Sequence, residues 1–255
     1  MYFATYSGKK IFTATVMAIV IFISSTVLYK TGAHAVFNGS NLRQLPIYRV
    51  QTEEKKLAIS FDCAWGTDYT DTLLSVMQEY DVKCTFFMVE FWTKKYPDYV
   101  EKIFRSGHEI GTHSATHPYM SKLDKAAIER ELTTSSSAIE NITGKKVEVF
   151  RPPYGDYDDL LIETAKELGL FTIQWDVDSL DWKDLSAEQI TNRVVSRVQK
   201  GSIVLFHNQG LHTAEALPAI IKELKSQGYT FVSIGELIYR DNYRMAVDGA
   251  QVKNS

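Results

Sequence analysis

The chain lacks several features that would assign it to a class at once. Its formal net charge is −3, so it has no basic excess of the kind that drives contact with a phosphate backbone, and we expect no nucleic-acid partner. It carries no internal repeat, no low-complexity tract and no carbohydrate-binding repeat, and nothing in it indicates a protein partner.

Cysteine is scarce, since only Cys63 and Cys84 occur in 255 residues. Cys63 follows one apolar run and Cys84 opens the next, so in parallel neighbouring strands the two thiols lie at opposite ends. Roughly five residues at ~3.3 Å each separate them, which is too far for a disulfide. We therefore expect Cys63 to be a free thiol or a metal ligand.

Hydrophobic residues are plentiful, at 45% of the chain with 12% aromatic. This composition supports a substantial core, and the length fits one large domain better than two small ones. The pattern divides the chain into an N-terminal membrane or signal segment (1–30), a linker (31–52), a globular domain (53–240) and a loose polar tail (241–255). Within the linker, Pro46 to Val50 is a candidate edge strand.

Residues 11–29 carry no charge, and at ~1.5 Å per helical residue they match roughly the thickness of a bilayer core. Lys9 and Lys10 precede this run, which favours an inside N-terminus and an extracytoplasmic domain. The first alternative is a membrane anchor through residues 11–29. The second is a cleaved secretory signal, because Ala33-His34-Ala35 has the form of a cleavage site.

Short apolar runs alternate with helix-length amphipathic stretches from residue 57 onward. The expected strands are 57–61, 84–89, 108–112, 147–150, 171–175, 202–206 and 230–234. The expected helices are 68–80, 122–140, 158–168, 187–198 and 213–227. This α/β alternation predicts a parallel sheet covered by helices, and seven or so units favour a (β/α) barrel over an open doubly wound sheet.

Ionisable residues follow five of the predicted strands. They are Asp62 and Cys63, His113 and His117, Arg151, the acids Asp176, Asp178 and Asp181, and His207. Each alone has an ordinary explanation, such as a solvated loop histidine or a buried core histidine. Because the carboxyl ends of parallel strands meet on one face, their coincidence predicts a catalytic site there. His34, His108 and His212 lie elsewhere, and we assign them no role.

These residue types fit metal-assisted hydrolysis of an amide or ester. Two imidazoles with a short acid or thiol provide three ligands for a divalent cation that activates water. A carboxylate beside an arginine is a candidate general base, and a histidine paired with an acid is a candidate proton donor. The segment HSATH lacks the glutamate of the HExxH helix, so a metalloprotease is disfavoured.

Five segments occur in the order of the signature motifs of one known family. They are SFDC (60–63), HSATH (113–117), RPPYG (151–155), DSLDW (178–182) and LFH (205–207). Over residues 56–239 the chain resembles the polysaccharide deacetylases, also called NodB-homology or carbohydrate esterase family 4 enzymes. The N-terminal segment and the length make it most similar to the sporulation-associated PdaB-type members. The resemblance implies a deformed (β/α) barrel that removes N-acetyl groups from glycans such as peptidoglycan.

The resemblance also implies a role for each matching residue. Asp62 is expected to be the general base, oriented by Arg151, and His207 the general acid, held by Asp178. His113 and His117 are expected to bind the metal, most simply Zn²⁺ with Co²⁺ as an alternative.

The expected substrate contacts come from the motif residues Tyr154, Pro153, Trp182 and Leu205. The Tyr154 backbone N–H is expected to help stabilise the oxyanion, and Trp182 and Leu205 to line a slot for the acetyl methyl and the sugar ring.

Position 63 departs from the family pattern, which has a second aspartate where this chain has Cys63. Three outcomes are open: a Cys-His-His zinc enzyme, a weakly active protein whose metal is held by two histidines, and a glycan-binding relative without catalysis. The leading function is a cell-wall N-deacetylase. The alternatives are a membrane-tethered glycan-binding protein and a hydrolase of another acylated substrate.

Overall fold

The computed structural model describes residues 43–254, and residues 44–255 form one compact unit. The predicted membrane or signal segment at 11–29 therefore lies outside the described residues. Within residues 43–254, no helix is both long enough and apolar enough to cross a bilayer.

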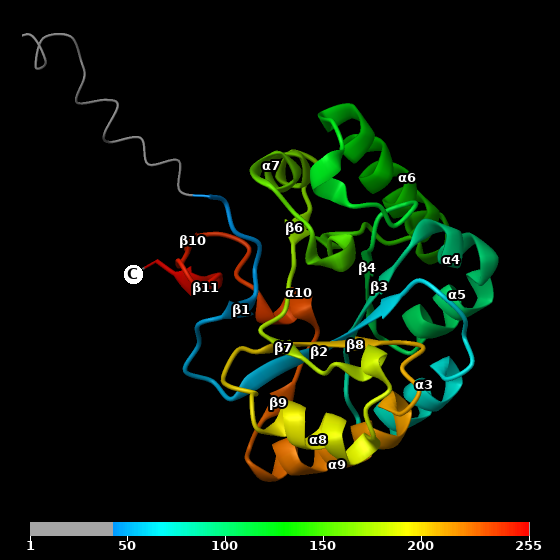
Figure 1. Cartoon of the computed structure of the whole chain (residues 1–255), viewed down its shortest axis with the longest axis vertical. Coiled ribbons are helices and arrows are strands. Elements are labelled where there is room, and N and C mark those ends of the chain that lie inside the picture. Colours follow the sequence, from blue (N-terminus) through cyan, green and yellow to red (C-terminus); the bar gives the residue numbers. More distant parts are fainter. Residues whose placement is uncertain (1–42, 255) are drawn as a thin grey trace, which may run out of the picture. The chain divides into compact units, whose positions relative to one another are not determined.

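Eleven strands make up two sheets in the described part of the chain. They are β1 (Arg49–Val50), β2 (Lys56–Cys63), β3 (Thr85–Met88), β4 (Glu109–Thr112), β5 (Val149–Phe150), β6 (Phe171–Thr172), β7 (Val177–Asp178), β8 (Ile203–His207), β9 (Thr230–Phe231), β10 (Tyr243–Met245) and β11 (Ala250–Lys253). The main sheet is parallel, in the order β6-β5-β4-β3-β2-β8-β7, with β9 paired to the start of β2. This curled parallel sheet confirms the α/β class and is consistent with the predicted deformed barrel (Figure 1).

Helices surround the outside of this sheet (Figure 1). They are α3 (Thr70–Glu79), α4 (Glu90–Lys95), α5 (Pro97–Arg105), α6 (Lys125–Thr143), α7 (Asp159–Glu167), α8 (Ala187–Val195), α9 (Thr213–Ser226) and α10 (Ile234–Leu237). Short 3₁₀ turns are η1 (Met120–Lys122), η2 (Pro153–Gly155) and η3 (Asp181–Lys183). Each of the five expected helices is present, whereas α4 and α5 were missed because no apolar periodicity was assigned between residues 89 and 108.

Local sequence explains where several helices begin and end. The Asp124 side chain accepts a hydrogen bond from the Ala127 N–H at the start of α6, and Gly144 takes the left-handed conformation (φ 68°) that ends it. Ser186 and Gln189 form a reciprocal capping box at the start of α8. These signals supply the hydrogen-bond partners that free helix ends would lack.

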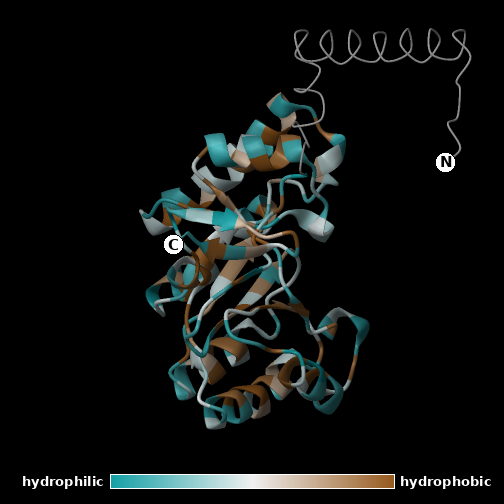
Figure 2. Ribbon diagram, turned by 90° about the vertical axis from the view of Figure 1, so that its left-hand side faces the viewer, coloured by the Kyte–Doolittle hydropathy of each residue, from teal (hydrophilic) through white to brown (hydrophobic). Residues whose placement is uncertain are grey.

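Strand β2 lies at the centre of the core and separates its two sides. Successive side chains of a strand point to opposite faces, so Phe61 and Cys63 pack in the cluster between sheet and helices. The ring of Phe61 stacks on Phe86 at 5.0 Å and on Phe206 at 5.7 Å. Figure 2 shows the strands and the inward helix faces as the apolar part of the domain. Ser60 and Asp62 therefore point to the other face of the sheet.

Strand register places the carboxyl ends of the central strands at one level. Cys63 pairs with Met88, Met88 with Thr112, and Thr112 with Phe150. On the other side of β2, Asp62 is the register partner of His207. The residues that follow β4 and β5, and the last residues of β2 and β8, consequently meet at one rim.

Both ends of the described chain differ from the sequence expectation. The tail 241–255, expected to be loose, forms the strands β10 and β11, and β11 pairs with β1. The compact unit accordingly begins at residue 44 rather than 53. Gly201 allows the Val50 carbonyl to approach β8, because a Cβ at that position would lie 1.7 Å from the Val50 oxygen. Residues 44–52 are thus part of the domain, not of a linker to it.

Candidate active site

Asp62 lies at the centre of the rim, 7% exposed, with charged and imidazole groups around it. Arg151 Nη1 donates a hydrogen bond to Asp62 Oδ1 at 2.8 Å. His113 Nε2 lies 3.6 Å from Asp62 Oδ2. The structure therefore brings together the side chains that follow β2, β4 and β5, as the sequence predicts.

Arg151 is completely buried and its guanidinium is fixed on several sides. Nη2 donates to Ser60 Oγ at 2.8 Å, and the group lies 4.2 Å from the centre of the Phe87 ring. Burial raises the pKa of Asp62, but the charge of Arg151 and then those of His113 and His207 outweigh it, and the pKa ends below its usual value. Asp62 is an ionised carboxylate with Oδ2 free of the arginine, which is the state that a general base needs.

His207 is held by Asp181, and this corrects the expectation that Asp178 holds it. The ring Nδ1 of His207 donates to Asp181 Oδ1 at 2.8 Å, and the backbone N–H of His207 donates to Asp181 Oδ2 at 2.8 Å. Asp178 Oδ1 instead accepts from the Leu180 N–H. Leu180 has a left-handed backbone (φ 57°), which turns the chain so that the second aspartate of DSLDW points at His207. Sequence spacing could not distinguish the two acids, because that turn has no glycine to mark it.

The His207–Asp181 pair is a candidate proton donor. Burial lowers the pKa of His207, but the hydrogen bond and the charge of Asp181 outweigh burial and raise it above its usual 6.5. Thr213 Oγ1 also donates to Asp181, so this fully buried carboxylate is oriented from two sides. Nε2 of His207 is left for contact with a substrate.

His113 and His117 lie together on the loop after β4, with ring centres 5.0 Å apart. His113 Nδ1 donates to the Arg151 carbonyl at 2.7 Å, which leaves Nε2 as the unprotonated nitrogen. Burial lowers the pKa of His113, and burial with the charge of His113 lowers the pKa of His117 to about 4. Both imidazoles are thus neutral at pH 7, the form that binds a metal ion.

Cys63 does not join this donor set, contrary to the expectation that it completes a metal triad. Its side chain is fully buried in the apolar cluster, with Sγ 4.0 Å from the Phe61 carbonyl oxygen. Burial, and then the charge of Asp62, raises the pKa of the thiol well above its usual value. Among residues 43–254 no group of three or more His, Cys, Asp or Glu side chains is arranged to hold a metal ion. The two imidazoles fit a cation, but a three-ligand protein site is not formed.

The four predicted substrate-contact residues lie in different surroundings. Tyr154 and Trp182 are exposed on η2 and η3, with 58% and 55% of their surface accessible. Leu205 is buried on β8, where it pairs with Ser60 and Asp178 in register, and Pro153 is buried at the start of η2. Trp182 carries the Lys183 ammonium over its ring at 4.7 Å.

Two exposed aromatic residues at the site were missed from sequence, Trp65 and Tyr119. Trp65 lies 5.4 Å from the His117 ring, and Tyr119 stacks on Tyr154 at 4.4 Å between ring centres. Trp65 follows the SFDC motif and Tyr119 follows HSATH, so both belong to loops that carry site residues. Their position in the sequence, next to motif residues, was the signal that could have identified them.

The site loops contain unusual backbone conformations. Ser114, His117, Tyr154 and Leu180 are non-glycine residues with φ between 57° and 71°. Such conformations are costly for residues with a Cβ and collect at functional sites. Glu131 of α6 stabilises one of these loops, because its carboxylate accepts hydrogen bonds from the N–H groups of Ala115 and Thr116. The loop therefore holds His117 in place through a residue that sequence patterns did not indicate.

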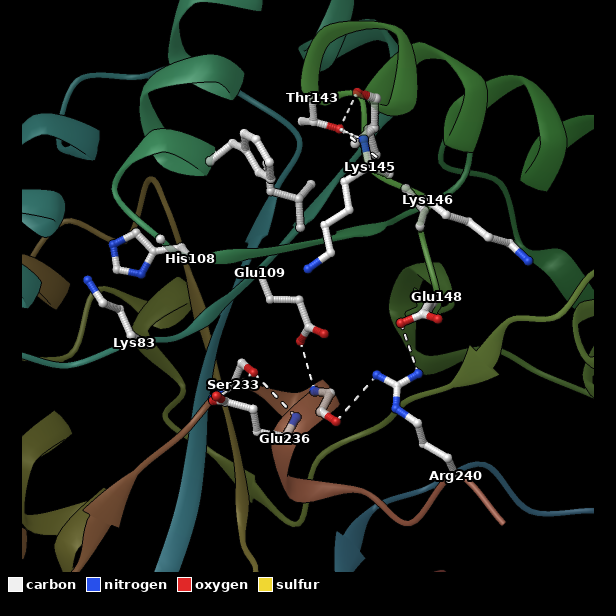
Figure 3. A pocket seen from close by; sticks show the side chains of 16 residues that line it. Lys83, His108, Glu109, Thr143, Lys145, Lys146, Glu148, Ser233, Glu236 and Arg240 are labelled. Atoms are coloured by element: carbon white, nitrogen blue, oxygen red, sulfur yellow. Dashed lines mark hydrogen bonds and ion pairs between the residues drawn. The ribbon is translucent and has the colours of Figure 1, made fainter.

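A separate cavity of about 260 Å³ opens at the amino ends of β3, β4 and β5 (Figure 3). Two of its charged lining residues have partners: Glu109 accepts from the Gly235 N–H, and Arg240 pairs with Glu148. His108 lies at one side of it, at the amino end of β4 and away from Asp62.

Comparison with known proteins gives a consistent assignment. Residues 49–173 match the family described as polysaccharide deacetylase. The chain is 36% identical to a peptidoglycan-N-acetylglucosamine deacetylase of Bacillus cereus, over 75% of this chain and 92% of that protein. It is also 34% identical to the uncharacterized protein YlxY of Bacillus subtilis, over 78% of this chain but only 62% of YlxY.

Among solved structures, one similar protein is a Bacillus anthracis protein described as a pseudoenzyme of the CE4 family. Its TM-score is 0.73 at 33% identity, covering 82% of this chain and 73% of that chain. A mutant of that protein with restored enzymatic activity has the same TM-score, at 35% identity over 81% of this chain and 72% of that one.

Proposed function

This chain belongs to the polysaccharide deacetylase family, and we propose that it hydrolyses N-acetyl groups of a cell-wall glycan such as peptidoglycan. The products are acetate and a free amino sugar. The observation that carries the proposal is the placement of a carboxylate and a histidine on register partners, Asp62 of β2 and His207 of β8. A base and an acid on adjacent strand ends can act on the two sides of one amide group.

The proton transfers are assigned to these side chains. Asp62 accepts a proton from the attacking water as the new C–O bond forms, and Arg151 keeps the carboxylate ionised until then. His207 donates its proton to the amide nitrogen as the C–N bond breaks, and Asp181 stabilises the protonated imidazole. The elements of one water are consumed for each acetate released.

A divalent cation, Zn²⁺ or Co²⁺, is part of the proposal, with His113 and His117 as its protein ligands. Such an ion supplies Lewis acidity at the acetyl oxygen and at water. Because Cys63 faces the core, the cation would be held by His113 and His117 alone, and we expect weaker retention than in a three-ligand site.

We place the reaction outside the cytoplasmic membrane. The relatives act on peptidoglycan by name, and residues 11–29 have the length and composition of an anchor or a signal. The PdaB-like resemblance extends the proposal to the spore wall.

The test is acetate release by the purified full chain from peptidoglycan and chitooligosaccharides, with added Zn²⁺ or Co²⁺. We expect release with the wild type and none with Asp62→Asn at an unchanged metal content. Undiminished release by Asp62→Asn would remove Asp62 from the role of base.

A second function, glycan binding without turnover, is favoured by one observation. Cys63 lies in the apolar cluster where the family pattern expects a metal ligand, and a similar structure is described as a pseudoenzyme. Under this alternative the protein binds the oligosaccharides in the same assay and releases no acetate at saturating metal.

A further inference from the structure

A pocket of about 680 Å³ lies beside β6, which is an edge strand of the main sheet. Three segments that are distant in the sequence line it, within residues 44–47, 162–172 and 240–245. Figure 1 shows the segment that leads into β1 running between β6 and β10. The volume falls in the range of about 300–1,000 Å³ that is usual for small-molecule sites. None of the residues of the candidate active site lines this pocket, so the two are separate.

Apolar side chains from all three segments line the pocket. They include Leu45, Ile162, Phe171 of β6 and Met245 of β10. Phe171 and Met245 pack against the core but are only partly buried. Apolar surface that borders a hollow instead of another side chain stays in contact with water, which is unfavourable. A ligand with an apolar part would cover this surface.

The charged residues that line the pocket are all cationic. They are Lys166 in the last turn of α7, Arg240, and Arg244 of β10, and no aspartate or glutamate is among the described lining residues. Arg240 pairs with Glu148 at 2.8 Å. The side chains of Lys166 and Arg244 are exposed, and neither has a hydrogen bond or an ion pair with another described residue. Cations that gather around a hollow without a counter-ion attract an anion.

Two acids of α7 contact the lining residue Gln44 without entering the pocket. The Gln44 N–H donates to Asp159 Oδ1 at 2.9 Å, and Gln44 Nε2 donates to Glu163 Oε1 at 2.6 Å. Neither acid is a lining residue. The charge that faces the pocket is therefore positive.

One buried hydroxyl group in the wall lacks a partner. Thr172 of β6 is 6% exposed and lines the pocket, and its Oγ1 is buried with no hydrogen-bond partner among the described residues. Buried polar groups are nearly always hydrogen-bonded, because an unpaired one lowers the stability of the fold. The hydrogen bonding of this wall is thus incomplete without a molecule from outside the chain.

We propose that this pocket binds one molecule of an amphipathic anion, that is, an apolar chain that ends in a carboxylate or a phosphate. The apolar chain contacts the wall that includes Leu45 and Met245, and the anionic end pairs with Lys166 and Arg244. A lipid in a bilayer keeps its chains in the membrane and offers only its head group, whereas a hollow of this size encloses the apolar part. The occupant is therefore a free, single-chain molecule. The proposal does not depend on glycan hydrolysis.

The test is isothermal titration of the purified full chain with octanoate, with its neutral isostere octanamide and with the shorter anion butanoate. We expect octanamide to bind at least about tenfold more weakly than octanoate, because it has no charge to pair with the cations. Butanoate should bind on the order of 100-fold more weakly, since it lacks four methylene groups that octanoate buries. Equal binding of octanoate and butanoate, or of octanoate and octanamide, contradicts the proposal.

Charge variants locate the binding site. Lys166→Gln and Arg244→Gln should each weaken octanoate binding by roughly fivefold, and Arg244→Glu should abolish it. Arg130→Gln removes an exposed arginine of α6 outside the pocket, so this matched control should bind as the wild type does. Melting followed by circular dichroism checks that each variant is folded. Unchanged octanoate binding in both pocket glutamine variants overturns the site.

A last pair of measurements separates this pocket from the candidate active site. His113→Ala should bind octanoate as the wild type does, and saturating octanoate should leave any acetate release unchanged. Loss of octanoate binding in His113→Ala but not in Arg244→Glu would place the anion at the active site and overturn the proposal. Octanoate binding that needs Lys166 and Arg244, in a protein that releases no acetate, supports the pocket and contradicts only the hydrolase.

Discussion

Strand β4 has a histidine at each end, His108 before its first residue and His113 after its last, and the two ends differ in every other respect. At the amino end, His108 is buried against Phe86, and its Nδ1 lies 3.4 Å from Cys84 Sγ. At the carboxyl end, His113 faces Asp62 with a free Nε2. At one end of the strand a histidine, His108, packs in the core, and at the other end a histidine, His113, is a candidate metal ligand.

The amino end also holds charged groups and a cavity, and several of these groups are hydrogen-bonded or paired. Glu109 accepts hydrogen bonds from Thr85 Oγ1 and the Gly235 N–H. Arg240 binds Glu148 (Figure 3). Burial raises the pKa of Glu109, and the hydrogen bonds from Thr85 and Gly235 and the charges of Arg240 and Lys145 do not outweigh it. A hollow lined by charges is therefore not by itself a reaction site.

The carboxyl end differs because its groups converge and remain available. Asp62, His113 and His207 belong to three strands that end at one level, and loops with strained backbone and exposed aromatic rings follow them. Parallel strands direct such loops to one face, so functional groups collect there. The difference shows that the site is distinguished by side chains that meet at one place and keep atoms available for a ligand. Cavity size does not distinguish it.

The test with the largest expected effect substitutes one buried acid at each end of the strands, Asp62 at the carboxyl end and Glu109 at the amino end. Asp62→Asn should lower acetate release by about 10³-fold or more, because the general base is lost. It should also destabilise the fold by up to about 3 kcal/mol, since Arg151 loses the charge of its buried partner. Glu109→Gln should leave the rate unchanged. Rate assays and urea unfolding measure both, and a large loss of rate in Glu109→Gln contradicts the comparison.

The two histidines of β4 give the next test. His113→Ala should reduce bound Zn²⁺ and lower the rate by roughly 100-fold, because one of two imidazole ligands is removed. His108→Ala should keep metal content and rate but lose about 2 kcal/mol of stability through the cavity it leaves. Metal analysis after dialysis separates the two variants. Equal metal loss in both means that the effect is structural.

The acids of the DSLDW segment provide a smaller effect. Asp181→Asn should lower the rate by about 100-fold and move the alkaline limb of the pH profile to lower pH. The physical reason is that the carboxylate raises the pKa of His207, and the proton donor is lost above that pKa. Asp178→Asn should stay within about twofold, since the amide oxygen can still accept from Leu180. A larger loss of rate in Asp178→Asn than in Asp181→Asn would mean that Asp178, and not Asp181, holds His207.

The smallest effect concerns stability against pH. Burial and Lys83 lower the pKa of His108 from 6.5 to about 4, so the folded state favours the neutral ring. The contribution of His108 to the free energy of unfolding is complete above pH 6.5. It falls by up to about 3 kcal/mol as the pH decreases toward 4. His108→Gln should flatten this part of the stability curve. Denaturant unfolding between pH 7 and 4 checks the slope, and parallel curves for both proteins contradict the assignment.

Much of the fold follows from local patterns. The seven apolar runs each overlap a strand of the structure, and the five amphipathic stretches each overlap a helix. The strand-end residues Asp62, Arg151 and His207 meet as expected, because hydrophobic periodicity locates strands and parallel strands share an end. The strand β7 and the hairpin of β10 and β11 were missed, because their residues are polar or short in extent and are stabilised by pairing partners distant in the chain.

What the sequence determined by itself was the alternation of strand and helix, and the kinds of chemical group that stand where the strands end. Only the tertiary structure decided that Cys63 faces the core while Asp62 faces the site, that Asp181 and not Asp178 reaches His207, and that Trp65 joins Tyr119 and Tyr154 beside His117. The reason is physical. Periodicity is a local property, whereas the direction of a side chain at the end of a strand or in a turn depends on backbone angles and on packing partners far away in the chain.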